Sequence, residues 1–195
     1  MFSRCVMAFT QSPEVHPYYD ALTNTVCYLV IDAETNACGV IDSVLNFDYA
    51  AGAISYEQAD SIISEIAGRG LKLQWLIETH VHADHITALG DLRDIYDCKT
   101  VMGEQSKVNC VSQSISDGEN LYLDEIKIKA IYTPGHTDDS YCYLLNDNKK
   151  QFLFSGDTLL INGNGRTDFQ NGNPSLLFES LHEKILILDD ETIIY

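Results

Sequence analysis

Residues 79–87 read THVHADHIT and place three histidines and one aspartate within six positions. The apolar run of residues 71–77 before them predicts a buried strand, and the apolar spacing from Ala88 to Tyr96 predicts a helix. The cluster therefore lies on a strand-to-helix turn, where an irregular backbone can bring its side chains around one point. A regular helix would spread them around its axis. The four donor residues are His80, His82, Asp84 and His85.

The chemistry of these side chains points to a metal. Imidazole nitrogens and carboxylate oxygens are donors that borderline divalent cations prefer. No cysteine stands among them, which argues against a closed structural zinc site. A polar loop with several surface histidines is the alternative, but donors at this density and spacing favour a metal site.

Two further strand ends carry donors of the same kind. The strand predicted at 126–132 is followed by TPGHT, in which proline and glycine force a turn that presents His136. The strand predicted at 151–154 is followed by SGDT, which contains Asp157. Taken singly, each could be an ordinary turn residue. Because strand ends meet on one rim of an α/β sheet, we expect both to approach the first cluster.

The N-terminal part of the chain predicts one hairpin between irregular segments. Residues 25–31 and 37–41 have strand composition and are joined by the turn-like DAETN. His16 lies between two prolines, which predicts a solvated loop, and residues 42–55 predict a second loop.

Capping signals mark two helices. Ser55 followed by Gln58 predicts a capping box at the start of a helix that runs through Ile66. Asn173 before a proline predicts the first turn of another helix, and residues 192–195 predict a final strand.

Length and charge limit the class of protein. With 195 residues and 45% hydrophobic content, the chain can form a single domain over residues 1–195. Its 29 acidic and 12 basic residues give a net charge of −17, which repels phosphate backbones and anionic lipids. We therefore expect neither nucleic acid nor a membrane as a partner.

The chain also lacks the marks of export or membrane insertion. No apolar run reaches the roughly 20 residues of a membrane span, and the first residues, MFSRCVMAFT, do not form a signal peptide. The six cysteines contain no C-x-x-C pair, and most lie in apolar runs. We expect a reduced, cytoplasmic protein.

A glycine-rich segment at residues 162–172, NGNGRTDFQNG, contains one cation, Arg166. It lacks the G-x-x-x-x-G-K pattern of a phosphate loop. In so acidic a chain, Arg166 is a candidate for binding a substrate carboxylate through two hydrogen bonds.

The three donor motifs in this order resemble the metallo-β-lactamase superfamily. They are H-x-H-x-D-H at residues 80–85, TPGHT with His136, and GDT with Asp157, and the resemblance covers about residues 24–195. It implies an α/β (α+β) fold in which four layers form an αββα sandwich with the metal at one rim.

Within that superfamily, GRTDFQ at 165–170, THVHADHIT, LHEKI and IDSVLNFDYAAG resemble the persulfide dioxygenase family, which is related to glyoxalase II. The resemblance implies oxidation of glutathione persulfide with O2 to sulfite and glutathione at one non-haem Fe(II) per chain. The metal ligands would be His80, His136 and Asp157, and Arg166 would anchor a glutathione carboxylate. A homodimer is compatible with the sequence, which does not determine the oligomeric state.

Two other functions stay open. In dinuclear zinc hydrolases of the hydroxyacylglutathione type, the positions of His82, Asp84 and His85 bind metal directly, whereas in a mononuclear site they would orient ligands or water. A non-catalytic metal-binding module is the third alternative.

The sequence departs from the persulfide dioxygenase pattern in two places. Asn164 stands where the family usually has the cysteine of GCGRTDFQ. The chain also stops at Tyr195, before the PAHDY-like motif that normally follows, so we expect a C-terminally incomplete domain.

Overall fold

The computed structural model describes residues 12–147 and 150–195, whose strands form two large sheets and one small one. The first large sheet comprises β1 (Glu14–Asp20), β2 (Thr25–Ile31), β3 (Ala37–Ile41), β6 (Lys72–Ile77), β8 (Lys99–Gly103) and β9 (Gln113–Ile115), in that order. The second comprises β10 (Asn120–Leu123), β11 (Ile126–Tyr132), β12 (Tyr141–Asn146), β13 (Gln151–Phe154) and β14 (Ile193–Ile194). The small sheet has the order β5 (Ala53–Ser55), β4 (Val44–Asp48) and β7 (Ile86–Thr87).

The two large sheets face each other across the main hydrophobic core. In β11, Ile126, Ile128 and Ala130 are buried in this core, while the alternating Lys127 and Lys129 are exposed on the other face. Trp75 on β6 belongs to the same core cluster as Tyr143 and Phe154 from the second sheet. Alternation along the strands therefore directs one face of each sheet inward.

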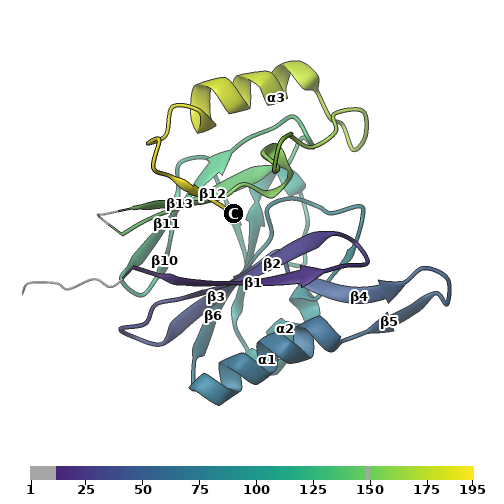
Figure 1. Cartoon of the computed structure of the whole chain (residues 1–195), viewed down its shortest axis with the longest axis vertical. Coiled ribbons are helices and arrows are strands. Elements are labelled where there is room, and N and C mark those ends of the chain that lie inside the picture. Colours follow the sequence, from purple (N-terminus) through teal and green to yellow (C-terminus); the bar gives the residue numbers. More distant parts are fainter. Residues whose placement is uncertain (1–11, 148–149) are drawn as a thin grey trace, which may run out of the picture.

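Helices cover the outer faces. They are α1 (Glu57–Arg69), α2 (Leu89–Tyr96) and α3 (Pro174–Ser180), the last continued by a π-helical turn at Leu181–Ile185. α1 and α2 bury Ile62 and Leu92 against the first sheet, whereas Ile185 packs on the second. Figure 1 shows α3 on one side of the paired sheets and α1 with α2 on the other. The predicted αββα sandwich is confirmed.

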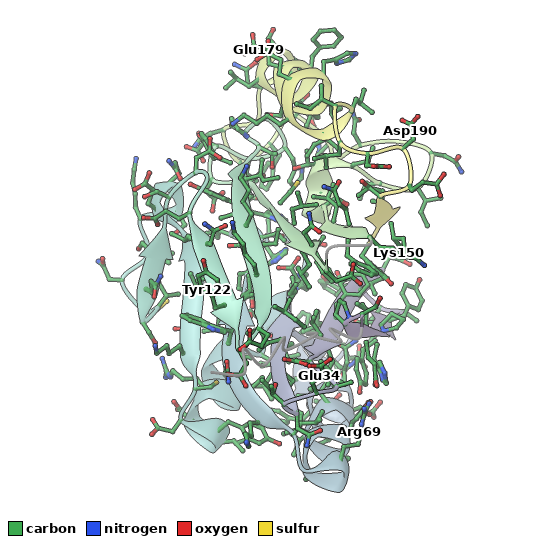
Figure 2. All side chains as sticks on the ribbon, turned by 90° about the vertical axis from the view of Figure 1, so that its left-hand side faces the viewer. Glu34, Arg69, Tyr122, Lys150, Glu179 and Asp190 are labelled. Carbon is green, nitrogen blue, oxygen red and sulfur yellow. The ribbon has the colours of Figure 1, made fainter. Side chains whose placement is uncertain are left out.

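Several charged side chains lie at the periphery. Figure 2 shows Arg69 at the end of α1 and Glu179 on α3 pointing outward.

Among residues 12–147 and 150–195, no helix has the length and apolar content to cross a bilayer. The five cysteines in these ranges are free thiols, and Cys110 is the exposed one among them. The predictions for MFSRCVMAFT, including Cys5, lie outside the described residues.

The predicted hairpin is confirmed, but both neighbouring loop predictions are wrong. β2 and β3 pair antiparallel, with Tyr28 opposite Ile41. His16 lies in β1 rather than in a loop, and its Nδ1 is 2.7 Å from a carboxylate oxygen of Glu65. β1 is an edge strand, where proline can be accommodated. Residues 42–55 contain β4 and β5 because these strands pair with each other.

The two helix starts differ in how they are capped. The predicted capping box is wrong: Tyr56 is the N-cap of α1 and makes no side-chain cap. Instead, Asn46 on β4 accepts a hydrogen bond from the Gln58 N–H at 2.9 Å. The prediction for α3 is confirmed, because the Asn173 side chain accepts from the backbone N–H groups of Ser175 and Leu176.

Strand direction brings the three donor motifs to one rim. β11 and β13 both run antiparallel to β12, so their C-terminal ends lie at the same edge of the second sheet. The end of β6 joins them there, since the Tyr141 N–H donates to the Thr79 carbonyl at 2.8 Å. The predicted final strand at 192–195 is confirmed as β14, which pairs in parallel with β13.

Candidate metal centre

The turn after β6 is held by buried carboxylates. Asp42 accepts hydrogen bonds from the Thr79 backbone N–H at 2.7 Å and from its hydroxyl at 2.8 Å. Asp139 accepts from the Val81 N–H at 2.9 Å. Asp42 has a positive φ of 53°, a conformation that aspartate tolerates better than most residues. These contacts keep the turn irregular, so that its imidazoles can gather at the rim.

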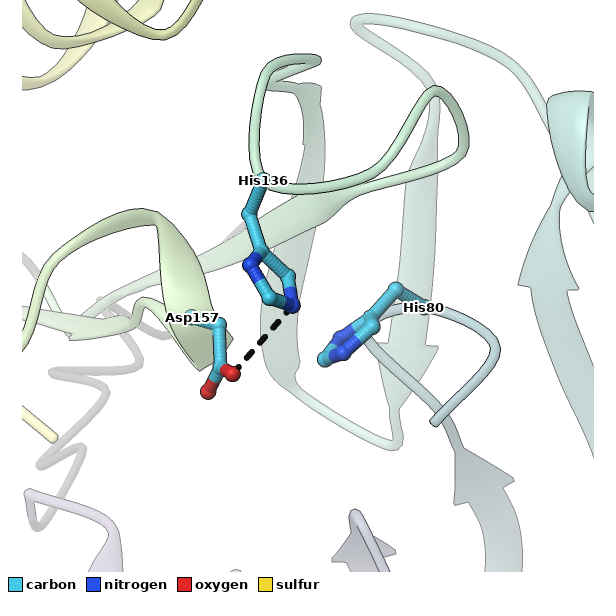
Figure 3. Close-up of side chains that lie close together, drawn as sticks. All are labelled: His80, His136 and Asp157. Atoms are coloured by element: carbon cyan, nitrogen blue, oxygen red, sulfur yellow. Dashed lines mark ion pairs between the residues drawn. The ribbon is translucent and has the colours of Figure 1, made fainter. Parts of the chain in front are cut away.

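The first group of donors is His80, His136 and Asp157, whose ligand atoms lie within 4.8 Å of one another (Figure 3). They come from the turns after β6, β11 and β13. Nε2 of His136 is 3.3 Å from Oδ2 of Asp157. His80 and His136 are buried, and Asp157 is partly buried in a 3₁₀ turn at Gly156–Thr158.

Hydrogen bonds assign the same tautomer to both histidines. Thr79 donates its one hydroxyl proton to Asp42, so it can only accept from Nδ1 of His80, which lies 3.0 Å away. Nδ1 of His136 faces the Arg166 carbonyl at 2.8 Å and must also be the donor. Both Nε2 atoms therefore carry lone pairs. A histidine held through one nitrogen with the other free is the usual arrangement of a metal ligand, so this donor set fits a divalent cation.

The second group is His82, Asp84 and His85, whose donor atoms also lie within 4.8 Å of one another. The rings of His82 and His85 are 4.1 Å apart between centroids, and His82 is equally close to His80. Both ring nitrogens of His85 are buried, and neither has a hydrogen-bond partner among the residues that the structure describes. The second group therefore adjoins the first and also offers free lone pairs.

A third group combines two buried carboxylates with one imidazole. Nε2 of His82 lies 3.2 Å from Asp42 and 3.1 Å from Glu78, both of which are buried. Burial disfavours a charged imidazole, but the two carboxylates outweigh it and raise the pKa of His82 well above its usual range. Burial raises the pKa of Glu78. The pair of carboxylates holds one edge of the His82 ring, which leaves Nδ1 for other partners.

Sequence reasoning missed Asp42 and Glu78. Each directly follows an apolar strand, β3 for Asp42 and β6 for Glu78. An acidic residue at the end of a buried strand is a signal that could have found Glu78, since it directly precedes the histidine cluster. Asp42 stands 37 positions before Thr79, and only the parallel pairing of β3 with β6 brings it there.

Burial keeps the free imidazoles neutral. It lowers the pKa of His80 well below its usual range, and it lowers the pKa of His85 to about 4. Burial raises the pKa of Asp157, although the neighbouring His136 opposes the shift. Neutral imidazoles at neutral pH bind a cation without first releasing a proton.

The predicted substrate residue, Arg166, points to the surface. Its guanidinium makes two hydrogen bonds to the Asp168 carboxylate, at 2.7 and 2.9 Å, and lies over the Phe169 ring. The Asp168 carboxylate in turn raises the pKa of Arg166. The charge of Arg166 is therefore paired with a neighbouring carboxylate on the surface.

A cleft of about 840 Å³ opens beside the donor groups. His82, Asp84 and Asp157 are among the residues that line it. The other lining residues are mainly apolar or aromatic, among them Tyr28 and Phe154, with Asp42 as a further carboxylate. A cavity of this size beside the donors can hold a small organic substrate.

Comparisons with known proteins agree with this geometry. The family model described as the metallo-beta-lactamase superfamily matches residues 21–109 and 115–195. A persulfide dioxygenase ETHE1 from Homo sapiens is 35% identical over 178 residues, which cover 91% of this chain and 65% of that protein. A beta-lactamase hydrolase-like protein from Xylella fastidiosa is 32% identical over 202 residues, covering 93% of this chain but 46% of that protein. The chain thus spans less than two thirds of either relative.

A solved structure shows the same arrangement of layers. The crystal structure of ETHE1 from Myxococcus xanthus matches with a TM-score of 0.82 at 37% identity, over 93% of this chain and 74% of that one. The sandwich, the donor groups on its rim and the match to the family model lead to one conclusion. The chain belongs to the metallo-β-lactamase superfamily.

Proposed function

We propose that the chain is a persulfide dioxygenase that oxidises glutathione persulfide at one non-haem Fe(II). One persulfide, one O2 and one water give one glutathione, one sulfite and two protons. The sulfur–sulfur bond breaks, the outer sulfur is oxidised and O2 is reduced, so no further oxidant is needed.

The observation that carries this proposal is the first donor group. His80 and His136 offer Nε2 lone pairs and Asp157 offers a carboxylate, which together make the two-histidine, one-carboxylate set of many non-haem iron oxygenases. The similarity to the human and Myxococcus xanthus proteins supports the same reading.

Each group of residues has a role in the proposal. The first donor group would hold Fe(II), which supplies open coordination positions and the redox chemistry for O2. His82 and Asp84 line the cleft and would orient substrate and water there. Arg166 would anchor a glutathione carboxylate by exchanging its exposed partner Asp168 for the substrate.

A second function is favoured by the second donor group. Within residues 12–147 and 150–195, the two buried ring nitrogens of His85 have no hydrogen-bond partner, and His85 lies beside His82 and Asp84. A second cation there would make a dinuclear site, and the chain would then act as a zinc-dependent hydroxyacylglutathione hydrolase.

Metal content of variants separates the two functions. For a mononuclear site, Asp157→Asn should lose most of the bound iron, while His85→Ala should retain it. Elemental analysis of both purified variants measures this directly. Equal metal loss in the two variants would instead support the dinuclear site.

Turnover of the wild-type chain completes the test. Oxygen uptake and sulfite formation with glutathione persulfide, at one iron per chain, support the dioxygenase. Two zinc ions with thioester cleavage and no oxygen uptake would overturn it. Metal binding without either turnover would favour a non-catalytic module.

A further inference from the structure

One short segment contacts all three turns that carry the first donor group. Residues 165–170, GRTDFQ, are named here the clamp segment. The Gly165 N–H donates to the Asp157 carbonyl at 2.8 Å. The Arg166 carbonyl accepts from His136 Nδ1 at 2.8 Å, and the Gln170 amide donates to the Val81 carbonyl at 2.7 Å. The segment therefore links the turns after β13, β11 and β6.

Gly165 lies where no side chain fits. A Cβ added there would be 2.3 Å from the Asp157 carbonyl oxygen and 2.6 Å from His136 Nδ1. Both distances are far inside van der Waals contact, and the first neighbour is backbone that cannot rotate away. The missing side chain allows the clamp segment to pass between two of the candidate ligands.

The carbonyl of Arg166 sets the direction of the His136 ring. By accepting from Nδ1, it leaves the lone pair on Nε2, which lies 3.3 Å from Asp157 Oδ2. This contact uses the backbone of Arg166, while its guanidinium binds Asp168 on the surface. Replacement of the arginine side chain therefore leaves this contact in place.

The other end of the clamp segment reaches the histidine cluster. Val81, whose carbonyl accepts from Gln170, stands between His80 and His82 in the chain. Just beyond the segment, the Asn173 N–H donates to the Gly135 carbonyl at 2.8 Å, beside His136. The turns after β6 and β11 are thus tied to the same stretch of backbone.

We infer that the clamp segment is a positioning element of the metal centre, which acts through the backbone of Gly165 and Arg166 and through the Gln170 amide. The inference rests on the metal site of the proposed function and not on the reaction. It applies equally whether one or two cations bind. Contacts outside the ligand set typically change metal affinity by about 10–100-fold.

The test compares two glycines in one loop. Gly165→Ala should weaken Co²⁺ binding by about 10–100-fold, because the new methyl group displaces His136 and Asp157. Gly163→Ala is the matched control, since, apart from its chain neighbours, no described residue has an atom within 4 Å of a Cβ at that position. Titration of the metal-free chains with Co²⁺, followed by its visible absorption, measures both affinities. Equal affinities in the two variants would overturn the inference.

Two further measurements separate positioning from loss of folding. Gln170→Ala should also bind Co²⁺ more weakly than wild type, whereas Arg166→Ala should keep wild-type Co²⁺ affinity. Weaker binding in the arginine variant alone would contradict a backbone mechanism. If Gly165→Ala does not fold, nitrogen-15 spectra of the Zn²⁺-loaded wild type decide. Protonated Nδ1 on His136 supports the inference, and protonated Nε2 overturns it.

Failure of the proposed function would look different. Suppose that the chain neither consumes O2 nor forms sulfite, while Gly165→Ala binds Co²⁺ more weakly than Gly163→Ala. The proposed dioxygenase activity is then wrong, and the inference about the clamp segment stands. If persulfide oxidation is normal but Gly165→Ala and Gly163→Ala bind Co²⁺ with equal affinity, the inference about the clamp segment is wrong and the proposed function stands.

Discussion

Asp42 offers a sharp test of how the buried charges stabilise the rim. Its carboxylate accepts from Thr79 and lies 3.2 Å from His82 Nε2. Asn is the informative replacement because it keeps the shape, can still accept from the Thr79 N–H and tolerates the left-handed backbone of this position. Asp42→Asn thus removes the charge and the oxygen that accepts from the Thr79 hydroxyl.

The magnitude follows from the geometry. At 3.2 Å and an effective dielectric constant of about 20, the Asp42–His82 attraction is about 5 kcal/mol before desolvation is subtracted. Glu78 still lies 3.1 Å from the ring after the change. Hydrogen bonds to charged groups contribute about 1.5–3 kcal/mol net, so we expect Asp42→Asn to lose about 2 kcal/mol of unfolding free energy at pH 6.

The pH dependence has a definite sign. Despite burial, the two carboxylates raise the pKa of His82 in the folded chain, while an unfolded histidine titrates near about 6.5. The stabilisation by the ion pair is therefore complete below about pH 6.5 and is lost as the pH rises through the raised pKa. The difference between Asp42→Asn and wild type should shrink at higher pH.

Urea unfolding of the metal-free chains at pH 6 and pH 9 measures both effects. Asp48→Asn is the control, because the Asp48 carboxylate likewise accepts hydrogen bonds from backbone N–H groups, those of Ala50 and Ala51, but is exposed. It should change stability by less than about 0.5 kcal/mol. If Asp42→Asn is no less stable than this control at pH 6, the ion pair does not stabilise the rim.

Two other predictions concern Arg166 and His85. Arg166→Ala should raise KM for glutathione persulfide because the carboxylate anchor is lost, and steady-state oxygen uptake measures it; an unchanged KM removes this role. Burial lowers the pKa of His85 to about 4 in the folded chain, whereas an unfolded histidine titrates near about 6.5. As the pH falls, the unfolded chain therefore binds a proton at His85 before the folded chain does. The unfolding free energy of the metal-free chain should fall from about pH 6.5 toward pH 4. His85→Gln should show a weaker fall in urea unfolding between pH 7 and pH 5, and an identical slope would contradict the buried neutral imidazole.

Much of the fold follows from local pattern. Alternation in residues 126–132 and the apolar run before His80 predicted β11 and β6, because each pattern is complete within a few residues. The failures involve partners distant in sequence. β4 and β5 form because they pair with each other, and Asn46 caps α1 from twelve positions away.

The candidate site divides in the same way. The sequence by itself determined the donor chemistry, since His80, His136 and Asp157 stand in three motifs that are recognisable by their combination and order. Only the tertiary structure decided that Asp42 and Glu78 hold His82, and that Arg166 contacts His136 through its carbonyl. The physical reason is that backbone carbonyls carry no side-chain signature and buried charges are matched across strands, so these contacts exist only once the chain has packed.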